Sequence, residues 1–320
     1  MFSPLTLGIL LQLGAFFCFA SMDTAAKWLV TAAIPALQVA FLRYAVHFGW
    51  TLVLYLPTRG RALFRSGTPR LQGLRALLLL GGTVLNFTAL GHLPLTVTIS
   101  IFFAAPLVVC LLSIPILGER VGARRFAAVL VGLLGVLVIV EPWGTSFDWH
   151  ILLSLGSLLS ISGYFVLTRR IAGVDSNAVT QAWAAGISTV LLAPLAFASG
   201  NWPASGFDWG LLLLLGSLGM LGHSMVTRAH DHAEASVLAP MVYSQMIYVT
   251  VFDWLFFDHA PDGSTMLGSA IIVLSGLYVW LRERRLSAPG KLRISSSTGS
   301  PVPESPAAGS PAGSNPNTRP

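Results

Sequence analysis

Four ionisable side chains interrupt the apolar runs of this sequence, and they are the groups most able to do chemistry. Asp23 and Lys27 stand four residues apart in ASMDTAAKWLV, so a helix would present both on one face. Arg43 lies in the next apolar run, and Asp253 lies near the end of a much later one. Because a charged group in apolar surroundings is costly unless it is paired or used, these residues indicate either an ion-pair network or a site for a charged ligand.

The composition identifies the medium around these charges. Charged residues make up 10% of the chain and hydrophobic residues 54%, with a mean hydropathy of +0.73, whereas soluble domains carry roughly a quarter of charged residues. We therefore expect an integral membrane protein. The first apolar run has no Lys or Arg before it, so we interpret it as a retained helix and not as a signal peptide. Cys18 and Cys110 both lie in apolar runs and are expected to be reduced packing residues.

Ten apolar segments are long enough to cross a membrane as helices, for which about 20 residues are needed. They are 6–28, 36–56, 73–92, 96–117, 124–141, 150–168, 179–198, 209–227, 236–257 and 265–282. Residues 287–320 are rich in Ser, Pro and Gly, and we expect them to form a disordered cytoplasmic tail. The sequence thus predicts an all-α integral membrane protein with ten transmembrane helices.

The distribution of positive charge predicts the orientation of these helices. If the N-terminus is cytoplasmic, every one of the 19 Lys and Arg residues except Lys27 and Arg43 lies at a cytoplasmic loop or end, Arg75 among them. The opposite loops carry only acidic charges: Glu141, Asp148, Asp208, Asp258 and Asp262. We expect both termini to be cytoplasmic in a multi-pass protein of the cell inner (plasma) membrane. The net charge of +6 then reflects topology, and no nucleic-acid partner is expected.

The sequence also resembles itself weakly at an offset near 140 residues. For example, LLLLGG at 77–82 is similar to LLLLLGS at 211–217, and LQVAFLR at 37–43 is similar to TQAWAAG at 180–186. The repeats cover residues 5–142 and 148–285 with five helices each. Because five is odd, the second repeat must enter the membrane in the opposite sense, which gives a 5+5 inverted repeat. Such repeats are typical of secondary transporters.

Several segments together resemble a known family. AAKWL at the end of the first helix, PLVVCLLSIPILGER, and AEASVLAPMVY at the start of the ninth helix are similar to the EamA-type branch of the drug/metabolite transporter superfamily. The resemblance covers about residues 5–285, and it implies a metabolite carrier with a central cavity lined by helices 1, 3, 4, 6, 8 and 9. One departure concerns Glu119 of the GER segment, whose counterpart in the second repeat falls at Asp258 and His259.

Two interpretations of Asp23, Lys27 and Arg43 remain open. In the first, the three side chains form a salt-bridge network that joins helices 1 and 2. In the second, Asp23 holds Lys27, and Arg43 faces the cavity and binds an anionic or zwitterionic substrate. Arg43 aligns with Gly186 and Asp23 with Val166 in the second repeat, so the charges occur in one half only. An architectural bridge would be expected to recur, and this favours a binding role.

Further candidates accompany these charges. Asp253 is a candidate for coupling transport to protons, with a solvated helix end or a partner of Arg43 as the alternatives. The remaining substrate-binding candidates are polar or aromatic groups in the cavity helices, with ordinary packing as the competing role: Asn86, Phe102, Tyr164, His223 and Tyr243. His230 and His232 of HDHAE are two residues apart and would point to different faces of a helix, so we expect no metal and no cofactor.

The favoured function is a secondary active carrier of small polar metabolites, such as amino acids, carboxylates or vitamin-like compounds, working by alternating access. A membrane-embedded enzyme would need a convergent cluster of His, Asp or Glu, which the sequence does not indicate. A channel or a non-transporting scaffold is the other alternative, and the repeat argues against it. The sequence has no P-loop, so ATP-driven transport is not expected. The expected partners are a small molecule and the bilayer, and a homodimer is left open.

Overall fold

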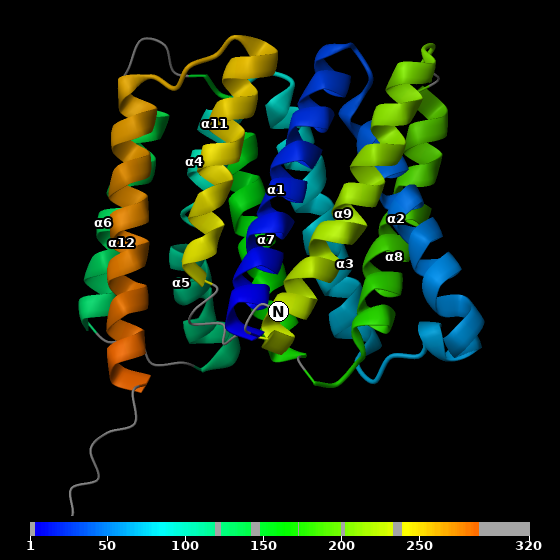
Figure 1. Cartoon of the computed structure of the whole chain (residues 1–320), viewed down its shortest axis with the longest axis horizontal. Helices are drawn as coiled ribbons and strands as arrows, with labels where there is room; N and C mark the ends of the chain where they lie inside the picture. Colours follow the sequence, from blue (N-terminus) through cyan, green and yellow to red (C-terminus); the bar gives the residue numbers. More distant parts are fainter. Residues whose placement is uncertain are drawn as a thin grey trace, which may run out of the picture.

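The computed structural model describes residues 4–118, 123–141, 148–171, 173–199, 202–232 and 239–287, and these residues form helices and connections without a strand (Figure 1). In chain order the elements are α1 (Pro4–Thr31), α2 (Ala36–Arg59), η1 (Gly60–Phe64), α3 (Pro69–Leu90), α4 (Leu95–Phe102), α5 (Ala105–Leu117), α6 (Ala123–Val140), α7 (Ile151–Arg170), α8 (Asn177–Ser199), α9 (Gly206–His232), η2 (Ala239–Tyr243), α11 (Ser244–Phe257) and α12 (Gly263–Ser287).

Within the described ranges, seven helical segments are long and apolar enough to cross a membrane, judged by length and composition. Three further apolar segments are shorter: Phe126–Val140, Met241–Phe257 and Gly263–Tyr278. The start of α1 and the end of α12 lie on the same side of the bundle (Figure 1). Ser287, the first residue of the predicted tail, ends α12, and residues 288–320 lie outside the described ranges. Residues 233–238 of the predicted loop after the eighth span lie outside them as well.

The predicted span 96–117 is interrupted in the structure. It divides into α4 and α5, with Phe103 and Ala104 between them. Pro106 stands in the first turn of α5, and because proline has no N–H it cannot donate to the carbonyl of Phe102 in a continuous helix. Phe103 and Ala104 keep helical backbone angles, so the two helices form one interrupted apolar segment, Leu95–Leu117.

The most extensive helix contacts join α1 to α9, α3 to α7, α2 to α8 and α6 to α12. In each of these pairs one helix comes from residues 5–142 and the other from 148–285. The α6–α12 pair is especially close at Gly135 and Gly268, where a Cβ atom on Gly135 would stand 2.8 Å from the carbonyl oxygen of Gly268. Small residues allow helix backbones to approach in this way in membrane bundles.

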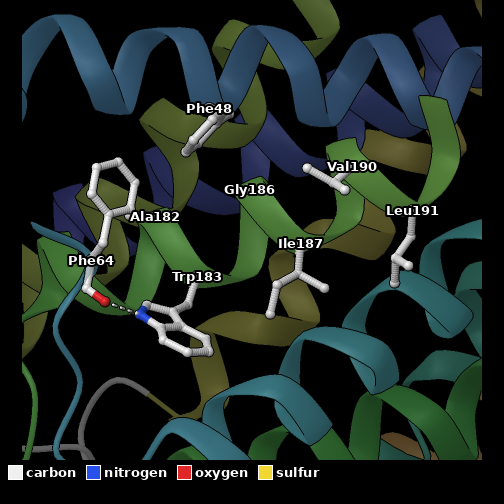
Figure 2. A pocket seen from close by; sticks show the side chains of 8 residues that line it. All are labelled: Phe48, Phe64, Ala182, Trp183, Gly186, Ile187, Val190 and Leu191. Atoms are coloured by element: carbon white, nitrogen blue, oxygen red, sulfur yellow. Dashed lines mark hydrogen bonds between the residues drawn. The ribbon is translucent and has the colours of Figure 1, made fainter.

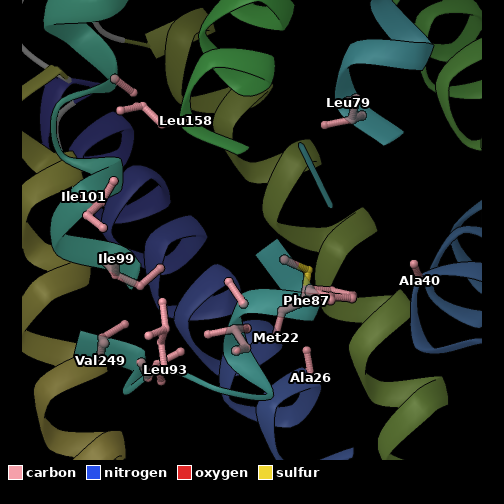
Figure 3. Packing of buried hydrophobic residues seen from close by; sticks show 14 of the residues in the cluster. Met22, Ala26, Ala40, Leu79, Phe87, Leu93, Ile99, Ile101, Leu158 and Val249 are labelled. Carbon is pink, nitrogen blue, oxygen red and sulfur yellow. The ribbon is translucent and has the colours of Figure 1, made fainter. Parts of the chain in front are cut away.

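A single large apolar core runs through the bundle. Its buried members come from both halves of the chain, and Figure 3 shows part of it, with Met22, Phe87, Ile99 and Val249 among the labelled side chains. The outward faces are also apolar: large side chains such as Val190, at 70% exposure, are open to the surroundings. A helical body that is apolar inside and outside is the pattern expected in lipid.

An acidic anchor ties two connections together on the side where the N-terminus lies. The carboxylate of Asp175, in the α7–α8 connection, accepts hydrogen bonds from Ser66 Oγ at 2.6 Å, the Gly67 amide at 2.9 Å and Gln72 Nε2 at 2.9 Å. Partial burial raises the pKa of Asp175, but the hydrogen bonds from Gln72, Ser66 and Gly67 outweigh burial and hold the pKa below its ordinary value of 3.8.

Candidate functional site

A central cavity of about 200 Å³ lies among α1, α2, α3, α4, α5, α7, α9 and the η2–α11 segment. The family resemblance implied a cavity lined by spans 1, 3, 4, 6, 8 and 9. These spans correspond to α1, α3, α4 with α5, α7, α9, and η2 with α11, and all of them line the cavity, together with α2. Six of the nine residues singled out from the sequence line this cavity: Asp23, Arg43, Asn86, Phe102, Tyr164 and His223. The other three, Lys27, Tyr243 and Asp253, are not among its lining residues.

Arg43 supplies the positive charge of the cavity. The residue is only 3% exposed, and its guanidinium lies against the face of the Tyr44 ring, 4.6 Å from the centroid. Nε donates to the sulfur of Met22 at 3.3 Å, whereas Nη1 is buried without a hydrogen-bond partner. Since arginine stays charged in proteins, an unpartnered guanidinium nitrogen at a cavity wall is suited to receive an anionic oxygen.

Asp23 supplies the negative charge and is held by two amides. Asn86 Nδ2 donates to one carboxylate oxygen at 3.3 Å, and Gln245 Nε2 approaches the other at 3.5 Å. These contacts join α1 to α3 and to α11 around the cavity wall. Gln245 was missed from the sequence, although it stands only two residues after the chosen Tyr243.

Lys27 does not pair with Asp23, so that prediction was wrong. Its ammonium is 2.9 Å from Asp253 Oδ1, and it lies over the ring of Phe257. The other oxygen of Asp253 accepts hydrogen bonds from the backbone amide and hydroxyl of Thr96, both at 3.0 Å. We call Lys27, Asp253 and Thr96 the outer cluster.

The outer cluster also corrects the interpretations of Asp253. This residue is fully buried, so it is not a solvated helix end, and its cationic partner is Lys27 and not Arg43. Its carboxylate sits at the first turn of α4, where amides are unpaired within the helix and the helix dipole favours negative charge. The cluster therefore joins α1 and α4 to α11 with mutually satisfied charges.

The aromatic candidates divide between the cavity and the packing around it. Phe102 and Tyr164 face the cavity, whereas Tyr243 packs edge-on against Phe103, with ring centroids 5.6 Å apart. His223 of α9 lies between two rings, 5.1 Å from that of Phe19 and 6.1 Å from that of His47.

Arg75 was assigned from the sequence to a cytoplasmic loop, and this was wrong. Helix α3 begins at Pro69, so Arg75 is already inside the helix, where it is 5% exposed. Its guanidinium donates to Thr168 Oγ1 at 2.6 Å and to the Tyr164 hydroxyl at 2.7 Å. The missed signal was its spacing along α3 from the polar residues Gln72, Thr83 and Asn86, which are also buried.

A larger hollow of about 420 Å³ lies between α2, η1 and α8 (Figure 2). Its lining side chains are apolar apart from the indole N–H of Trp183, which donates to the Phe64 carbonyl at 3.2 Å. Val190 and Leu191 on its rim are exposed. The hollow thus belongs to the outward apolar surface and offers no charge to a polar molecule.

Within the described part of the chain, no group of three or more His, Cys, Asp or Glu residues could hold a metal ion. His232 ends α9, and the following residues of HDHAE lie outside the described ranges. Among the residues that line the cavity, the charged side chains are those of Asp23 and Arg43.

The chain matches the EamA-like transporter family twice, over residues 6–141 and over 148–281. Among curated proteins it is 32% identical over 273 residues to the pseudopaline exporter CntI of Pseudomonas aeruginosa, covering 84% of this chain and 94% of that one. A riboflavin transporter of Rhizobium johnstonii is 28% identical over 284 residues, covering 88% and 94%. An S-adenosylmethionine uptake transporter of Rickettsia felis is 26% identical over 267 residues, covering 82% and 88%.

A solved crystal structure shares the fold. It superposes with a TM-score of 0.57 at 20% sequence identity and covers 86% of this chain and 99% of its own.

Proposed function

The chain belongs to the EamA-like transporter family and is a multi-pass membrane transporter of small molecules, and from this premise we propose that it is a secondary carrier of small metabolites that bear a carboxylate. The proposed substrate is anionic or zwitterionic and binds in the central cavity between Arg43 and Asp23. The relatives differ in the molecules named for them, so the substrate class is argued from the cavity of this chain.

The pairing of Arg43 with Asp23 in one cavity is the observation that carries the proposal. Both residues line the cavity and are at least nine-tenths buried, and a guanidinium nitrogen has no hydrogen-bond partner. Burying an unpaired charge is costly, so a structural role alone gives little reason for this arrangement. A carboxylate placed on Arg43 would satisfy the guanidinium, and an ammonium on the same molecule could bind Asp23.

We further propose ten transmembrane helices arranged as two inverted repeats, 5–142 and 148–285. The contact pattern supports this, because exchanging the two repeats maps the α1–α9 pair onto α3–α7 and the α2–α9 pair onto α3–α8, while α2–α8 and α6–α12 map onto themselves. The start of α1 and the end of α12 lie on the same side of the bundle (Figure 1), and the Lys and Arg residues of the loops gather on one side of the predicted topology. Both observations support cytoplasmic termini in an inner membrane.

For alternating access we propose that the outer cluster is the external gate. It lies at the side opposite the N-terminus and bridges α1 and α4 to α11. Opening the cavity to the outside would require Lys27 and Asp253 to separate and take up water. In this proposal, protonation of the Asp253 carboxylate would weaken its ion pair with Lys27 and so favour opening of the cavity to the outside.

Counterflow in proteoliposomes tests the carrier proposal. Vesicles loaded with a cell metabolite extract would be assayed for efflux by mass spectrometry, with the wild type, Arg43→Gln and the control Arg70→Gln on the exposed start of α3. We expect a carboxylate-bearing metabolite to leave vesicles with the wild type and the control but not with Arg43→Gln. Equal release by all three would place the site elsewhere, and no release by folded wild type would contradict a carrier.

A further inference from the structure

We infer that Arg75 is a second anion-binding position on the same path, and that the substrate is a small amino acid with two acidic groups. The inference rests on the proposed function and deepens it. Arg75 is 5% exposed, and its Nη1 is buried without a hydrogen-bond partner, as is Nη1 of Arg43. The two arginines thus share one feature: each has a buried guanidinium nitrogen that is free to donate a hydrogen bond to an anion.

Tyr164 connects Arg75 to the cavity. The Tyr164 side chain lines the cavity, and its hydroxyl accepts the hydrogen bond from Arg75 Nη2 at 2.7 Å. Thr168, one turn further along α7, accepts from Nε at 2.6 Å. The partners that hold Arg75 are neutral hydroxyls, and no carboxylate of the described residues lies within ion-pair distance. The guanidinium also lies over the face of the Tyr164 ring, 4.4 Å from its centroid. Tyr164 therefore stands between Arg75 and the cavity, and in this proposal a shift of its ring exposes Arg75 to a molecule there.

The polar residues of α3 define an order of depth. Asn86 holds Asp23 toward the outer side, Thr83 contacts Tyr44 beside Arg43, and Arg75 follows toward the cytoplasmic end. At 1.5 Å per residue, Arg75 lies about 12 Å below Thr83 and about 16 Å below Asn86 along the helix axis. The two arginines therefore stand at successive depths along the path, Arg43 at the level of Thr83 and Arg75 nearer the cytoplasmic end.

Counting charges gives the substrate class. Lys27 and Asp253 neutralise each other in the outer cluster, which leaves Arg43, Arg75 and Asp23 along the path. Two positive groups and one negative group are complementary to a molecule with two carboxylates and one ammonium. A dicarboxylic amino acid has this set, with the ammonium bound at Asp23 and one carboxylate at each arginine.

The cavity volume agrees with a molecule of this size. At about 200 Å³ it is smaller than the roughly 300–1,000 Å³ of sites that enclose drug-sized ligands. A compact amino acid therefore suits this conformation better than a large ring system does.

A purely structural role for Arg75, clamping α3 to α7, makes a different prediction. A clamp would affect stability without discriminating between ligands. The test therefore compares L-glutamate with L-glutamine, which lacks the second acid, and with glutarate, which lacks the ammonium. Affinities of purified full-length protein would be measured by ligand-dependent thermal shift and by calorimetry.

For the wild type we expect L-glutamate to bind about 10- to 150-fold more tightly than either analogue, the range for losing one charged hydrogen-bonding group. Arg75→Gln should reduce the affinity for glutamate to that for glutamine and leave glutamine unchanged. Arg43→Gln should weaken both amino acids, and Asp23→Asn should spare glutarate. Arg70→Gln is the matched control on α3 and should change none of the three affinities.

Absence of discrimination in the wild type, or equal weakening of both amino acids by Arg75→Gln, would overturn the inference. An intact preference for glutamate in a destabilised Arg75→Gln would identify a clamp and overturn it as well. If Arg75→Gln does not fold, Arg75→Met replaces it, because it also removes the charge and keeps a long side chain for packing. Unchanged affinity for glutamate in that variant would contradict the inference. Metabolite release from the extract-loaded vesicles, measured separately, would then still support the carrier proposal.

Discussion

The ion pair between Lys27 and Asp253 allows a quantitative prediction. Changing Asp253 to Asn leaves the buried ammonium of Lys27, 5% exposed, with the Phe257 ring as its remaining charge-stabilising contact. Removing one partner of a buried ion pair costs about 3–5 kcal/mol, because the other charge is left uncompensated. The control is Asp258→Asn, the same chemical change five residues later at an exposed position, and it should have no measurable effect.

A double-mutant cycle separates the pair from its surroundings. Lys27→Met alone leaves the Asp253 carboxylate with its hydrogen bonds from Thr96 but without a cation. The double variant has no buried charge at this place. Its loss of unfolding free energy should therefore be smaller than the sum of the two single losses by about 2–3 kcal/mol.

Thermal unfolding in detergent would measure these effects. At about 1.5 °C per kcal/mol for a chain of this length, each single variant should lower Tm by about 4–8 °C. Hydrogen exchange of the Thr96 amide, which donates to Asp253 at 3.0 Å, should accelerate in Asp253→Asn as the start of α4 loosens. A shift no larger than that of Asp258→Asn, or strict additivity in the double variant, would refute the assignment of a buried, coupled pair.

Four further substitutions test the fold around the site. Gly135→Val should destabilise the protein by about 1–3 kcal/mol, because the new side chain would overpack against Gly268. Gly49→Ala, at a helical glycine with open space around its Cβ position, should instead stabilise the protein by about 0.5–1 kcal/mol. Chemical denaturation would measure both changes. Tyr44→Phe should cost about 1 kcal/mol, because it removes a hydroxyl that contacts α3 at 2.7 Å, and calorimetry would detect the loss. Asp175→Asn should reduce the free energy of unfolding by about 1 kcal/mol at neutral pH. Since the pKa of Asp175 is lowered in the folded protein, the extra stability of the wild type is fully present above pH 3.8 and is lost as the pH falls through the pKa of the folded protein. Melting curves recorded from pH 7 to pH 3 would test this pH dependence.

The sequence was most informative where one local property decides the structure. Apolar length located the seven long and three shorter apolar helical segments, because a chain in lipid must satisfy its own backbone. It did not locate η1, which lies between two predicted spans. The rarity of charge in those segments identified Arg43 and Asp23 as cavity residues. Helix ends were less certain: the positive-inside rule assigned Arg75 to a cytoplasmic loop or end, whereas α3 opens at Pro69, about one turn before the predicted start at residue 73.

Partners distant in the chain could not be predicted. Lys27 was matched with Asp23 because the two share a helix face, but its partner is 226 residues away. Which carboxylate meets the ammonium depends on how α11 lies beside α1 and α4, and that register is fixed by packing between the halves. The central cavity itself has the same origin, since its walls come from both halves.

The interleaved helix pairs have a consequence for how the protein is made. Because α1, α2, α3 and α6 each find their most extensive contact with a helix of the later half, the first five helices leave the ribosome without their main partners. They must remain in the bilayer, with the buried surfaces of the finished protein unmatched, until the second half is inserted. The chain thus assembles like two exchanged subunits fused into one polypeptide, and neither half is an independently completed body.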